Sequence, residues 1–523
     1  MGLHRLKAIR VGVALVFLTL AALVFADFHN LVAPSVARGV LFLQFVPSLL
    51  QFVNAATLGA TGCVVVIVVT LLFGRVYCST FCPLGTIQDV VGFVARKQRM
   101  RPDFHFSAPH TALRYAILGL TFLLLLAGNG LLLNLLDPFS SFGRIVANLV
   151  RPVVLLLNNV AAVLLEQWGV YALPRVQWAA FAPVSVAVSL ATLLLVIRLA
   201  ATRGRLYCNT LCPVGTLLGI FSKVSWLQIG IDPAACRGCR LCEDACKAGC
   251  IDSRQKTVDS SRCVSCWNCL AVCHRNGLRF DNTWRRRPPA APPDRERREF
   301  LLNSGVLLLG LAGVPEPTRV IIQSKPTTIP EQVTCPVSPP GSASIARFTA
   351  TCTACHLCVS ACPSRVLVPS LFEFGFQGVM QPRMNFHSGH CNYDCTICMN
   401  LCPSGAMLPL GVAQKKLTQL GVARFIKENC VVFTDNTACG ACSEHCPTKA
   451  VDMVPYPNPA KKDLKIPEMK PDYCIGCGGC EHACPTRPYK AIYVDGNPVH
   501  KLAKQPVVKK VDVPVDNKED FPF

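Results

Sequence analysis

The chain has 523 residues, 51% of them hydrophobic, and a mean hydropathy of +0.38, which excludes an ordinary soluble protein of this length. The formal charge of +21 is compatible with a nucleic-acid partner, but no recognised nucleic-acid-binding module is present and we expect no such partner. The 31 cysteines are unevenly placed, with five in residues 1–235 and 26 in residues 236–523, so an apolar part is joined to a cysteine-rich part.

The apolar part contains four segments long enough to cross a hydrocarbon core of roughly 30 Å. These segments lie at approximately 8–26, 55–73, 112–134 and 179–200. Two shorter apolar stretches, 40–52 and 152–165, carry Pro, Asn and Gln, and we expect them at the membrane surface. Lys and Arg concentrate before the first segment and after the second and fourth, which predicts that both ends of this unit are cytoplasmic.

One motif occurs twice in this unit, each time after the second helix of a predicted helix pair. Gly74-Arg-Val-Tyr-Cys78-Ser-Thr-Phe-Cys82-Pro-Leu-Gly-Thr86 returns as Gly204-Arg-Leu-Tyr-Cys208-Asn-Thr-Leu-Cys212-Pro-Val-Gly-Thr216, with an offset of 130 residues at every position. A recurrence of this length in the same topological place indicates an internal two-fold duplication.

The duplicated motif supplies four cysteines, Cys78, Cys82, Cys208 and Cys212. If the repeats pack about a pseudo-two-fold axis, the two pairs face each other and form a ligand set for an iron–sulfur cluster at the cytoplasmic membrane edge. A helix starting at Pro83 or Pro213 would favour thiolates through its N-terminal dipole. The alternatives are a disulfide within each pair, reduced structural thiols, or cysteines used in assembly; a cytoplasmic position disfavours the disulfides.

Six motifs of closely spaced cysteines follow in residues 236–523. In chain order they are Cys236, Cys239, Cys242 and Cys246; Cys263, Cys266, Cys269 and Cys273; Cys352, Cys355, Cys358 and Cys362; Cys391, Cys395, Cys398 and Cys402; Cys430, Cys439, Cys442 and Cys446; and Cys474, Cys477, Cys480 and Cys484. Three cysteines at this spacing wrap one cubane and ligate three of its irons, and the fourth ligand comes from elsewhere. We therefore predict six [4Fe–4S] clusters, with the duplicated motif as a candidate seventh.

The fourth cysteine of each motif in a two-cluster ferredoxin ligates the cluster of the other motif, so motifs work in pairs. We pair the first motif with the second, the third with the fourth and the fifth with the sixth. The predicted ligand sets are Cys236/239/242 with Cys273, Cys263/266/269 with Cys246, Cys352/355/358 with Cys402, Cys391/395/398 with Cys362, Cys430/439/442 with Cys484, and Cys474/477/480 with Cys446. Pairing of motif three with six and of four with five stays open, and Cys250 can replace Cys246.

Zinc and disulfides fit this pattern poorly. Zinc ribbons use two separated CxxC pairs around one ion, whereas these are complete quartets with tight, regular spacing. Histidines beside the motifs, such as His356, are interpreted as surface or supporting residues because each quartet is already complete. Cys63, Cys250 and Cys335 are left over.

Residues 284–345 form a predicted linker that contains Arg297-Arg298 and an apolar segment at 300–314. An apolar run after an arginine pair fits the core of an export signal, or a fifth membrane helix, although it is short for a full span. Export would place residues 346–523 in the periplasm, opposite a cytoplasmic 223–283. The alternative is a packed or interfacial helix that leaves every cluster cytoplasmic.

The helices, the two CxxxCP motifs and the first two-cluster unit, over residues 1 to about 283, resemble NapH, the membrane ferredoxin of periplasmic nitrate reductase systems. They are also similar to the membrane portion of NosR, to MauN and to the assembly protein CcoG. From Arg297 onward, the arginine pair and the widened Cys430-x8-Cys439 spacing resemble NapG, a four-cluster ferredoxin protein. The resemblance implies that the protein oxidises quinol and passes electrons to a periplasmic reductase.

The expected fold is an α-helical membrane domain, with four helices in a two-fold repeat and a candidate fifth at 300–314, joined to α+β ferredoxin-like domains. The domains are 1–222, 223–283, the linker 284–345, 346–502 and a tail 503–523. We expect a multi-pass protein of the bacterial inner membrane that carries electrons from quinol, or from a cytoplasmic donor, to a periplasmic or membrane redox partner protein. The alternative is an assembly or metal-reducing maturation factor.

No catalytic residue is assigned, and an activity beyond electron transfer would be quinol oxidation. Any quinone chemistry is expected near the membrane unit, where the candidate residues are Asp27, His29, Asp137 and Glu166. Each of them is equally compatible with a solvated loop position.

Overall fold

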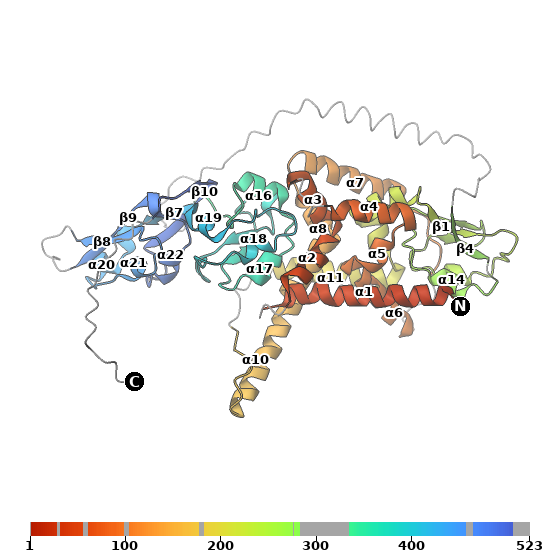
Figure 1. The fold of residues 1–523 in the computed structure, drawn as a ribbon, viewed down its shortest axis with the longest axis horizontal. Coiled ribbons are helices and arrows are strands. Elements are labelled where there is room, and N and C mark those ends of the chain that lie inside the picture. Colours follow the sequence, from red (N-terminus) through yellow and green to blue (C-terminus); the bar gives the residue numbers. More distant parts are fainter. Residues whose placement is uncertain are drawn as a thin grey trace, which may run out of the picture.

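The computed structural model describes residues 2–28, 32–55, 61–98, 104–176, 182–275, 277–282, 334–456 and 464–505. The arginine pair at 297–298, the apolar segment 300–314, His29 and the tail from 506 lie outside the described residues. Figure 1 shows a helical unit with a smaller domain at each end: the first ferredoxin unit beside the N-terminus, and the C-terminal domain at the opposite end.

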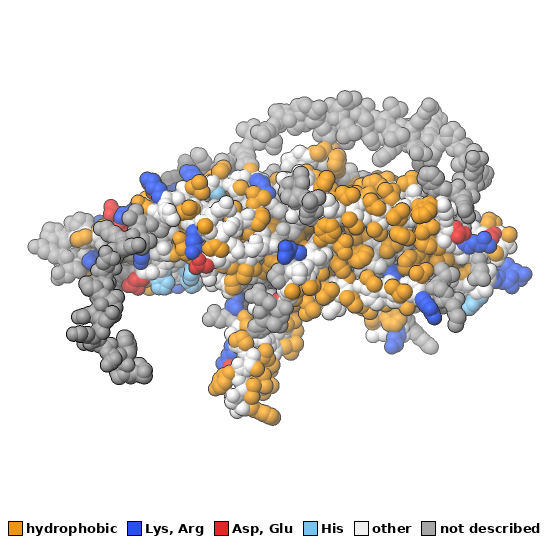
Figure 2. All heavy atoms as spheres, viewed as in Figure 1, with side chains coloured by type: hydrophobic (Ala, Val, Ile, Leu, Met, Phe, Trp, Pro, Cys, Tyr) orange, Lys and Arg blue, Asp and Glu red, His pale blue; other side chains and the backbone are white. Residues whose placement is uncertain are grey.

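The helical unit covers residues 2–222. Its elements are α1 Gly2–Ala26, α2 Pro34–Phe42, α3 Phe45–Ala55, α4 Gly62–Phe73, α5 Val76–Thr80, α6 Pro83–Lys97, α7 Thr111–Leu126, α8 Leu131–Leu136, α9 Pro138–Ile145, the π-helix η2 Val146–Val150, α10 Arg151–Gln167, α11 Pro183–Arg203, the π-helix η3 Tyr207–Leu211 and α12 Pro213–Ser222. Figure 2 shows hydrophobic side chains covering the middle of this unit, while charged side chains gather toward the ends of the molecule.

Three helical runs among the described residues are long and apolar enough to cross a membrane: Arg5–Ala26, Pro138–Gln167 and Pro183–Arg203. A fourth candidate is the pair α2 and α3, which is bent by 92°. The predicted segments 8–26 and 179–200 correspond to the first and third of these runs. The other two predicted spans differ, because α4 has 12 residues and α7 ends at Leu126.

The stretch 152–165, predicted as a surface helix, is continuous with α9 and η2 in a run of 30 residues. Within this stretch the side-chain amide of Asn159 forms two hydrogen bonds with the backbone of Val176. The amide Nδ2 donates to the Val176 carbonyl at 2.8 Å, and Oδ1 accepts from Val176 N at 2.9 Å. Figure 1 shows α10 projecting from the helical unit at a steep angle to α1.

Glycines end the helix before each copy of the duplicated motif. Gly74 and Gly204 have φ of 73° and 63°, a region that L-residues with side chains rarely adopt. A Cβ at Gly204 would come within 2.2 Å of the Lys247 carbonyl oxygen, and one at Gly74 within 2.8 Å of Ser265 Oγ. Both breaks therefore allow the first ferredoxin domain to approach the helix ends closely.

The first ferredoxin domain is small and built from short elements around two cysteine motifs. They are β1 Leu227–Ile231, α13 Leu241–Asp244, β2 Ile251–Asp252, β3 Thr257–Val258, α14 Asn268–Val272 and β4 Leu278–Asn282. The outer strands β1 and β4 pair antiparallel with Ile229 opposite Phe280, and β2 pairs with β3. This gives each motif one short helix, with strands that close the domain.

The C-terminal domain again gives each of its four motifs a short helix, and its strands form three antiparallel pairs. Its elements are α16 Ile345–Thr351, α17 Leu357–Ala361, β5 Leu367–Pro369, η6 Phe376–Gly378, β6 Pro382–Met384, α18 Ile397–Asn400, α19 Val412–Leu417, β7 Thr418–Phe425, η7 Lys427–Asn429, α20 Val431–Thr434, α21 Ala441–Glu444, β8 Val451–Pro455, β9 Lys465–Met469, η9 Pro471–Tyr473, α22 Gly479–Ala483 and β10 Ile492–Leu502. The strand pairs are β5 with β6, β7 with β10, and β8 with β9, all antiparallel.

The domain begins earlier than the expected boundary at 346. Thr334 Oγ1 donates to one oxygen of Asp495 at 2.5 Å, and Cys335 N donates to the other at 2.9 Å. Residues 334–345, which we assigned to the linker, therefore pack on β10. Apolar periodicity gives no signal for this stretch, because backbone and carboxylate contacts hold it.

Candidate iron–sulfur centres

Three small cavities in the ferredoxin domains are each lined by four cysteines, three from one motif and one from its partner. These cysteines are Cys236, Cys239, Cys242 and Cys273; Cys362, Cys391, Cys395 and Cys398; and Cys430, Cys439, Cys442 and Cys484. The structure therefore brings together the ligand sets predicted from the exchange of fourth cysteines between paired motifs. It pairs motif three with motif four and motif five with motif six, rather than three with six and four with five.

The cysteines of the three remaining predicted ligand sets also lie near one another. Their thiols lie close enough that a charge on one acts on the others: Cys246 with Cys263, Cys266 and Cys269; Cys402 with Cys352, Cys355 and Cys358; and Cys446 with Cys474, Cys477 and Cys480. All 24 motif cysteines thus fall into six groups of four.

Several buried thiols of these groups need a cationic partner to ionise. Burial raises the pKa of Cys355, Cys442 and Cys477 to about 12. A thiolate ligand in such a site becomes stable when a cationic iron core is bound beside it, so the donor sets fit a four-iron cluster. Within the described part of the chain, no three Cys, His, Asp or Glu side chains are grouped as for a single metal ion.

Cys250 lies beside the second motif as an additional thiol. Its sulfur is 3.5 Å from that of Cys246, and it also contacts Cys263. The hydrogen bond from Cys250 lowers the pKa of Cys246 to about 6, while the pKa of Cys250 itself is raised. This arrangement favours Cys246 as the thiolate and Cys250 as the thiol that donates to it.

The four cysteines of the duplicated motif are all buried in the helical unit. Cys82 is the N-cap of α6, where its sulfur accepts from Gly85 N at 3.4 Å, and Cys212 caps α12 by the same bond from Gly215 N at 3.3 Å. Cys78 and Cys208 lie in α5 and η3, one turn earlier. The thiols of both copies lie within electrostatic reach of one another, so the structure brings together the four residues that we predicted to converge.

The arginine of each copy crosses to the other copy. Arg75 Nη2 donates to the carbonyl of Cys208 at 3.1 Å, and Arg205 Nη1 donates to the carbonyl of Cys78 at 2.6 Å. The glycine two residues after the proline of each motif makes room for this crossing. A Cβ at Gly215 would lie 2.1 Å from the Cys208 oxygen, and one at Gly85 would lie 2.4 Å from the Cys78 oxygen. The motif's arginine and second glycine therefore hold the two cysteine pairs against each other.

Two polar residues beside this site were not predicted from the sequence. Gln88 Nε2 donates to the sulfur of Cys208 at 3.2 Å. Asp89 forms ion pairs with Arg10 at 3.4 Å, with Arg205 at 2.7 Å and with Lys247. The signal that could have found them is a difference between the repeats, because the matching positions in the second copy are Leu218 and Gly219.

We call Cys78, Cys82, Cys208 and Cys212 the membrane cysteines, and the place where they meet the membrane site. Residues next to these cysteines contact the first ferredoxin domain around its second motif. Arg75 Nη1 donates to the Ser261 carbonyl at 3.0 Å, two residues before Cys263. Asn209, next to Cys208, donates from Nδ2 to the carbonyl of Ala248 at 3.1 Å. The backbone around Cys246 and Cys263 is therefore bonded directly to the backbone and side chains around the membrane site.

On its other side the membrane site approaches motif three of the C-terminal domain. Tyr207, next to Cys208, donates to the Leu136 carbonyl at 3.0 Å. The buried Arg144 donates to the Leu135 carbonyl at 3.2 Å and to the Ala354 carbonyl at 3.3 Å, one residue before Cys355.

His356 completes this contact. Its ring bonds to Asn148 at 3.3 Å and to the Met380 carbonyl at 2.8 Å, and burial lowers its pKa to about 3. It is therefore a neutral supporting residue, as the sequence suggested.

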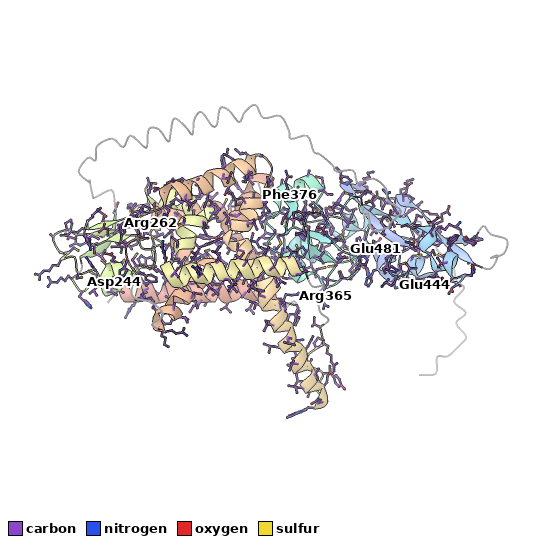
Figure 3. The ribbon with its side chains drawn as sticks, turned by 180° about the vertical axis from the view of Figure 1, so that it is seen from behind. Asp244, Arg262, Arg365, Phe376, Glu444 and Glu481 are labelled. Atoms are coloured by element: carbon purple, nitrogen blue, oxygen red, sulfur yellow. The ribbon has the colours of Figure 1, made fainter. Side chains whose placement is uncertain are left out.

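Within the C-terminal domain the second pair of motifs continues away from the helical unit. Cys391 N donates to the Cys477 carbonyl at 2.9 Å, which joins motif four to motif six. Figure 3 shows the molecule from behind, with Arg365 near the helical unit, Glu481 farther out and Glu444 farther still. Motif five, which contains Cys442, therefore lies at the far end.

The residues proposed for quinone chemistry have local structural partners. Asp137 caps α9, where its carboxylate accepts from Ser140 N at 2.7 Å, and Asp27 accepts from Val32 N at 2.8 Å. Glu166 pairs with Arg175. Each of the three carboxylates therefore has at least one partner, although Asp137 Oδ1 is buried without a partner among the described residues. None of the three lines the cavity that adjoins Gln88 and Asp89, which is described below.

Two protein families match the chain, each of them twice. The family described as a 4Fe-4S binding domain matches residues 55–101 and 185–231, which contain the four membrane cysteines. The family described as a 4Fe-4S dicluster domain matches residues 351–406 and 437–487. Together with the fourfold cysteine groups, these matches define a ferredoxin-type protein that transfers electrons through 4Fe–4S clusters and has several candidate membrane helices.

Comparison with related proteins identifies the family within this class of ferredoxin-type proteins. An uncharacterized protein of Methanocaldococcus jannaschii is 39% identical over 74 residues, which cover 14% of this chain and only 29% of that protein. Ferredoxin-type protein NapH of Haemophilus influenzae is 25% identical over 260 residues, covering 47% of this chain and 74% of NapH. Ferredoxin-type protein NapG of the same organism is 31% identical over 207 residues, covering 38% of this chain and 71% of NapG. No solved structure matches the chain. The chain belongs to the family of NapG-like and NapH-like ferredoxin-type proteins, which confirms the resemblance seen in its motifs.

Proposed function

We propose that this protein is a membrane-bound electron conduit in which one membrane cluster joins two sets of ferredoxin clusters into a single line. The observation that carries the proposal is the position of the four membrane cysteines between motif two and motif three. In order, the seven proposed [4Fe–4S] centres are held by Cys236/239/242/273, Cys263/266/269/246, Cys78/82/208/212, Cys352/355/358/402, Cys391/395/398/362, Cys474/477/480/446 and Cys430/439/442/484.

Contacts on both sides of the membrane site support this order. Arg75 bonds the membrane site to Ser261 near motif two, and Tyr207 and Arg144 lead to Ala354 near motif three. Electrons move between clusters one at a time, and the clusters need no bond chemistry on a substrate. The donor is quinol or a cytoplasmic carrier, and the acceptor is a partner reductase.

The proposed location is the bacterial inner membrane, with residues 223–283 cytoplasmic and the C-terminal domain periplasmic. Helix α1 supports this arrangement because it contacts α14 of the first ferredoxin domain and α17 of the C-terminal domain. Basic residues near the start of α1 favour a cytoplasmic N-terminus. Protease added to intact spheroplasts should digest residues 334–505. Digestion only after membrane rupture would place every cluster in the cytoplasm.

The line of clusters is tested by replacing Cys78 and Cys208 together with Ser. Anaerobically purified wild type should contain about 28 irons per chain, and the double variant about 24. A reduced quinone analogue should bleach every cluster of the wild type, whereas the clusters of motifs three to six should stay oxidised in the variant. Unchanged iron content and electron flow would refute the membrane centre. Reduction of copper without a response to quinol would indicate the maturation factor instead.

A further inference from the structure

A cavity of about 800 Å³ lies beside the membrane cysteines, between α1, α6 and the first ferredoxin domain. Its walls are mostly apolar and include Val11 and Leu15 of α1 and Val90 and Phe93 of α6. Phe93 is 68% exposed and Leu15 46% exposed on the outer surface of the helical unit. In a membrane-bound chain these side chains face lipid, so the cavity opens toward the bilayer.

The inner end of the cavity is polar and adjoins two cysteine sets. Gln88 and Arg205 line it, and both reach the sulfur of Cys208, at 3.2 and 3.9 Å. Asn268, which precedes Cys269 of the second motif, lines it as well. A ligand head group in this position would lie between the membrane site and the second ferredoxin site.

Four buried polar atoms of the residues that line this cavity lack a partner among the described residues: Arg10 Nε, Gln88 Oε1, Arg205 Nη2 and Asn268 Oδ1. Gln88 Oε1 is an acceptor and Arg205 Nη2 is a donor, on side chains with 2% and 1% exposure. An unpaired buried polar group is destabilising, so such atoms indicate a missing partner. One acceptor and one donor, on two side chains that both reach the Cys208 sulfur, match a hydroxyl group, which can donate to Gln88 and accept from Arg205.

We propose that this cavity binds a quinol of the membrane pool, with the ring hydroxyl at Gln88 and Arg205 and the isoprenoid tail between α1 and α6. This inference rests on the proposed function, since a redox ligand matters only if the neighbouring cysteines hold clusters. The quinol breaks its two O–H bonds and becomes the quinone. Its two electrons reduce two clusters by one electron each, and its two protons leave to water past Lys7 and Lys97 at the rim. Electrons would therefore enter inside the line of clusters rather than at its end.

Binding is tested separately from electron flow with 2-heptyl-4-hydroxyquinoline-N-oxide, a quinol analogue whose fluorescence is quenched when it binds. Leu15→Trp should fill the cavity and weaken binding at least tenfold. The matched control is Val16→Trp, since Val16 is 60% exposed on the same helix and does not line the cavity. Gln88→Leu, which introduces the residue of the second repeat, should weaken binding about tenfold through the lost hydrogen bond.

The outcomes separate the two proposals. Cluster absorbance and reduction by dithionite should be the same in Leu15→Trp, Val16→Trp and the wild type, which shows that the line of clusters is intact in the matched pair of variants. Equal binding in Leu15→Trp and Val16→Trp, or no binding by the wild type, would overturn the quinol cavity while leaving the conduit standing. Loss of the clusters from the wild-type preparation would instead refute the conduit.

Discussion

Gly143 of the helical unit lies directly against the carbonyl oxygen of Cys355 in the C-terminal domain. A Cβ at Gly143 would come within 2.4 Å of that oxygen and within 2.7 Å of the Phe25 ring. The contact brings the backbone of a proposed cluster ligand to the end of α1, with no room for a side chain between them. We therefore predict that Gly143→Ala opens the contact between the helical unit and the C-terminal domain.

Overpacking of this kind costs about 1–3 kcal/mol. The variant should show faster hydrogen exchange in α17 and slower reduction of motifs three to six by quinol. Gly119→Ala in α7 is the control, because a Cβ there meets nothing within 4 Å. If both variants exchange and transfer electrons like the wild type, the contact does not hold the domain in place.

The crossing arginines give a second prediction. Arg205→Lys should lose the membrane cluster, because a single ammonium cannot bond the Cys78 carbonyl and Asp89 together as the guanidinium does. Iron should fall by about four per chain while the six ferredoxin signals remain. Arg203→Lys changes an exposed arginine of α11 and should leave the iron content unchanged. A full complement of iron in Arg205→Lys would show that the crossing bonds are dispensable.

The cysteine groups could be predicted from the sequence because ligand spacing is a local property. The swap of Cys273 and Cys246 needs only a chain that returns after a turn, and the same geometry recurs in each pair. The offset of 130 residues between Cys78 and Cys208 predicted their convergence for the same reason, since equal segments tend to pack symmetrically.

Contacts that differ between the two repeats could not be predicted from the sequence. Asp89 has no partner nearby in the chain; its cations come from α1, from the second repeat and from the ferredoxin domain. The length of one helix was also predicted wrongly. Hydropathy predicted a helix over 112–134, but after Leu126 the chain turns at Gly128, whose φ is 74°. Apolar composition does not register such a turn.

The position of Cys250 leads to a third prediction, which decides between the two candidate ligands of the second cluster. Cys246→Ser should lose that cluster, whereas Cys250→Ser should retain all of the iron, because the serine hydroxyl can still donate to the Cys246 thiolate. Because a hydroxyl is a stronger donor than a thiol, the hydrogen bond to the ligand sulfur should raise the reduction potential of the cluster in Cys250→Ser. Potentiometric EPR measures both effects. Loss of iron in Cys250→Ser, with full iron in Cys246→Ser, would reverse the assignment.

The last prediction concerns the pH dependence of the C-terminal domain. The imidazole ring of His500, in β10, forms one hydrogen bond, between its Nε2 and Ser338 Oγ at 2.8 Å. The other ring nitrogen, Nδ1, is buried and has no partner among the described residues. Burial lowers its pKa to about 4. An unfolded histidine has a pKa of about 6.5, so between these values the unfolded chain binds a proton that the folded domain excludes.

Folding stability contributed by His500 is therefore complete above about pH 6.5 and decreases as the pH falls toward 4. Between pH 7 and pH 5.5 the loss should be about 1.2 kcal/mol, which corresponds to roughly eightfold faster opening. Hydrogen exchange of β10 in the full chain, corrected for the intrinsic rate at each pH, measures this change. His500→Gln should remove the pH dependence, while His387→Gln, at an exposed position of the same domain, should retain it. A pH dependence of equal size in His500→Gln would show that another group is responsible.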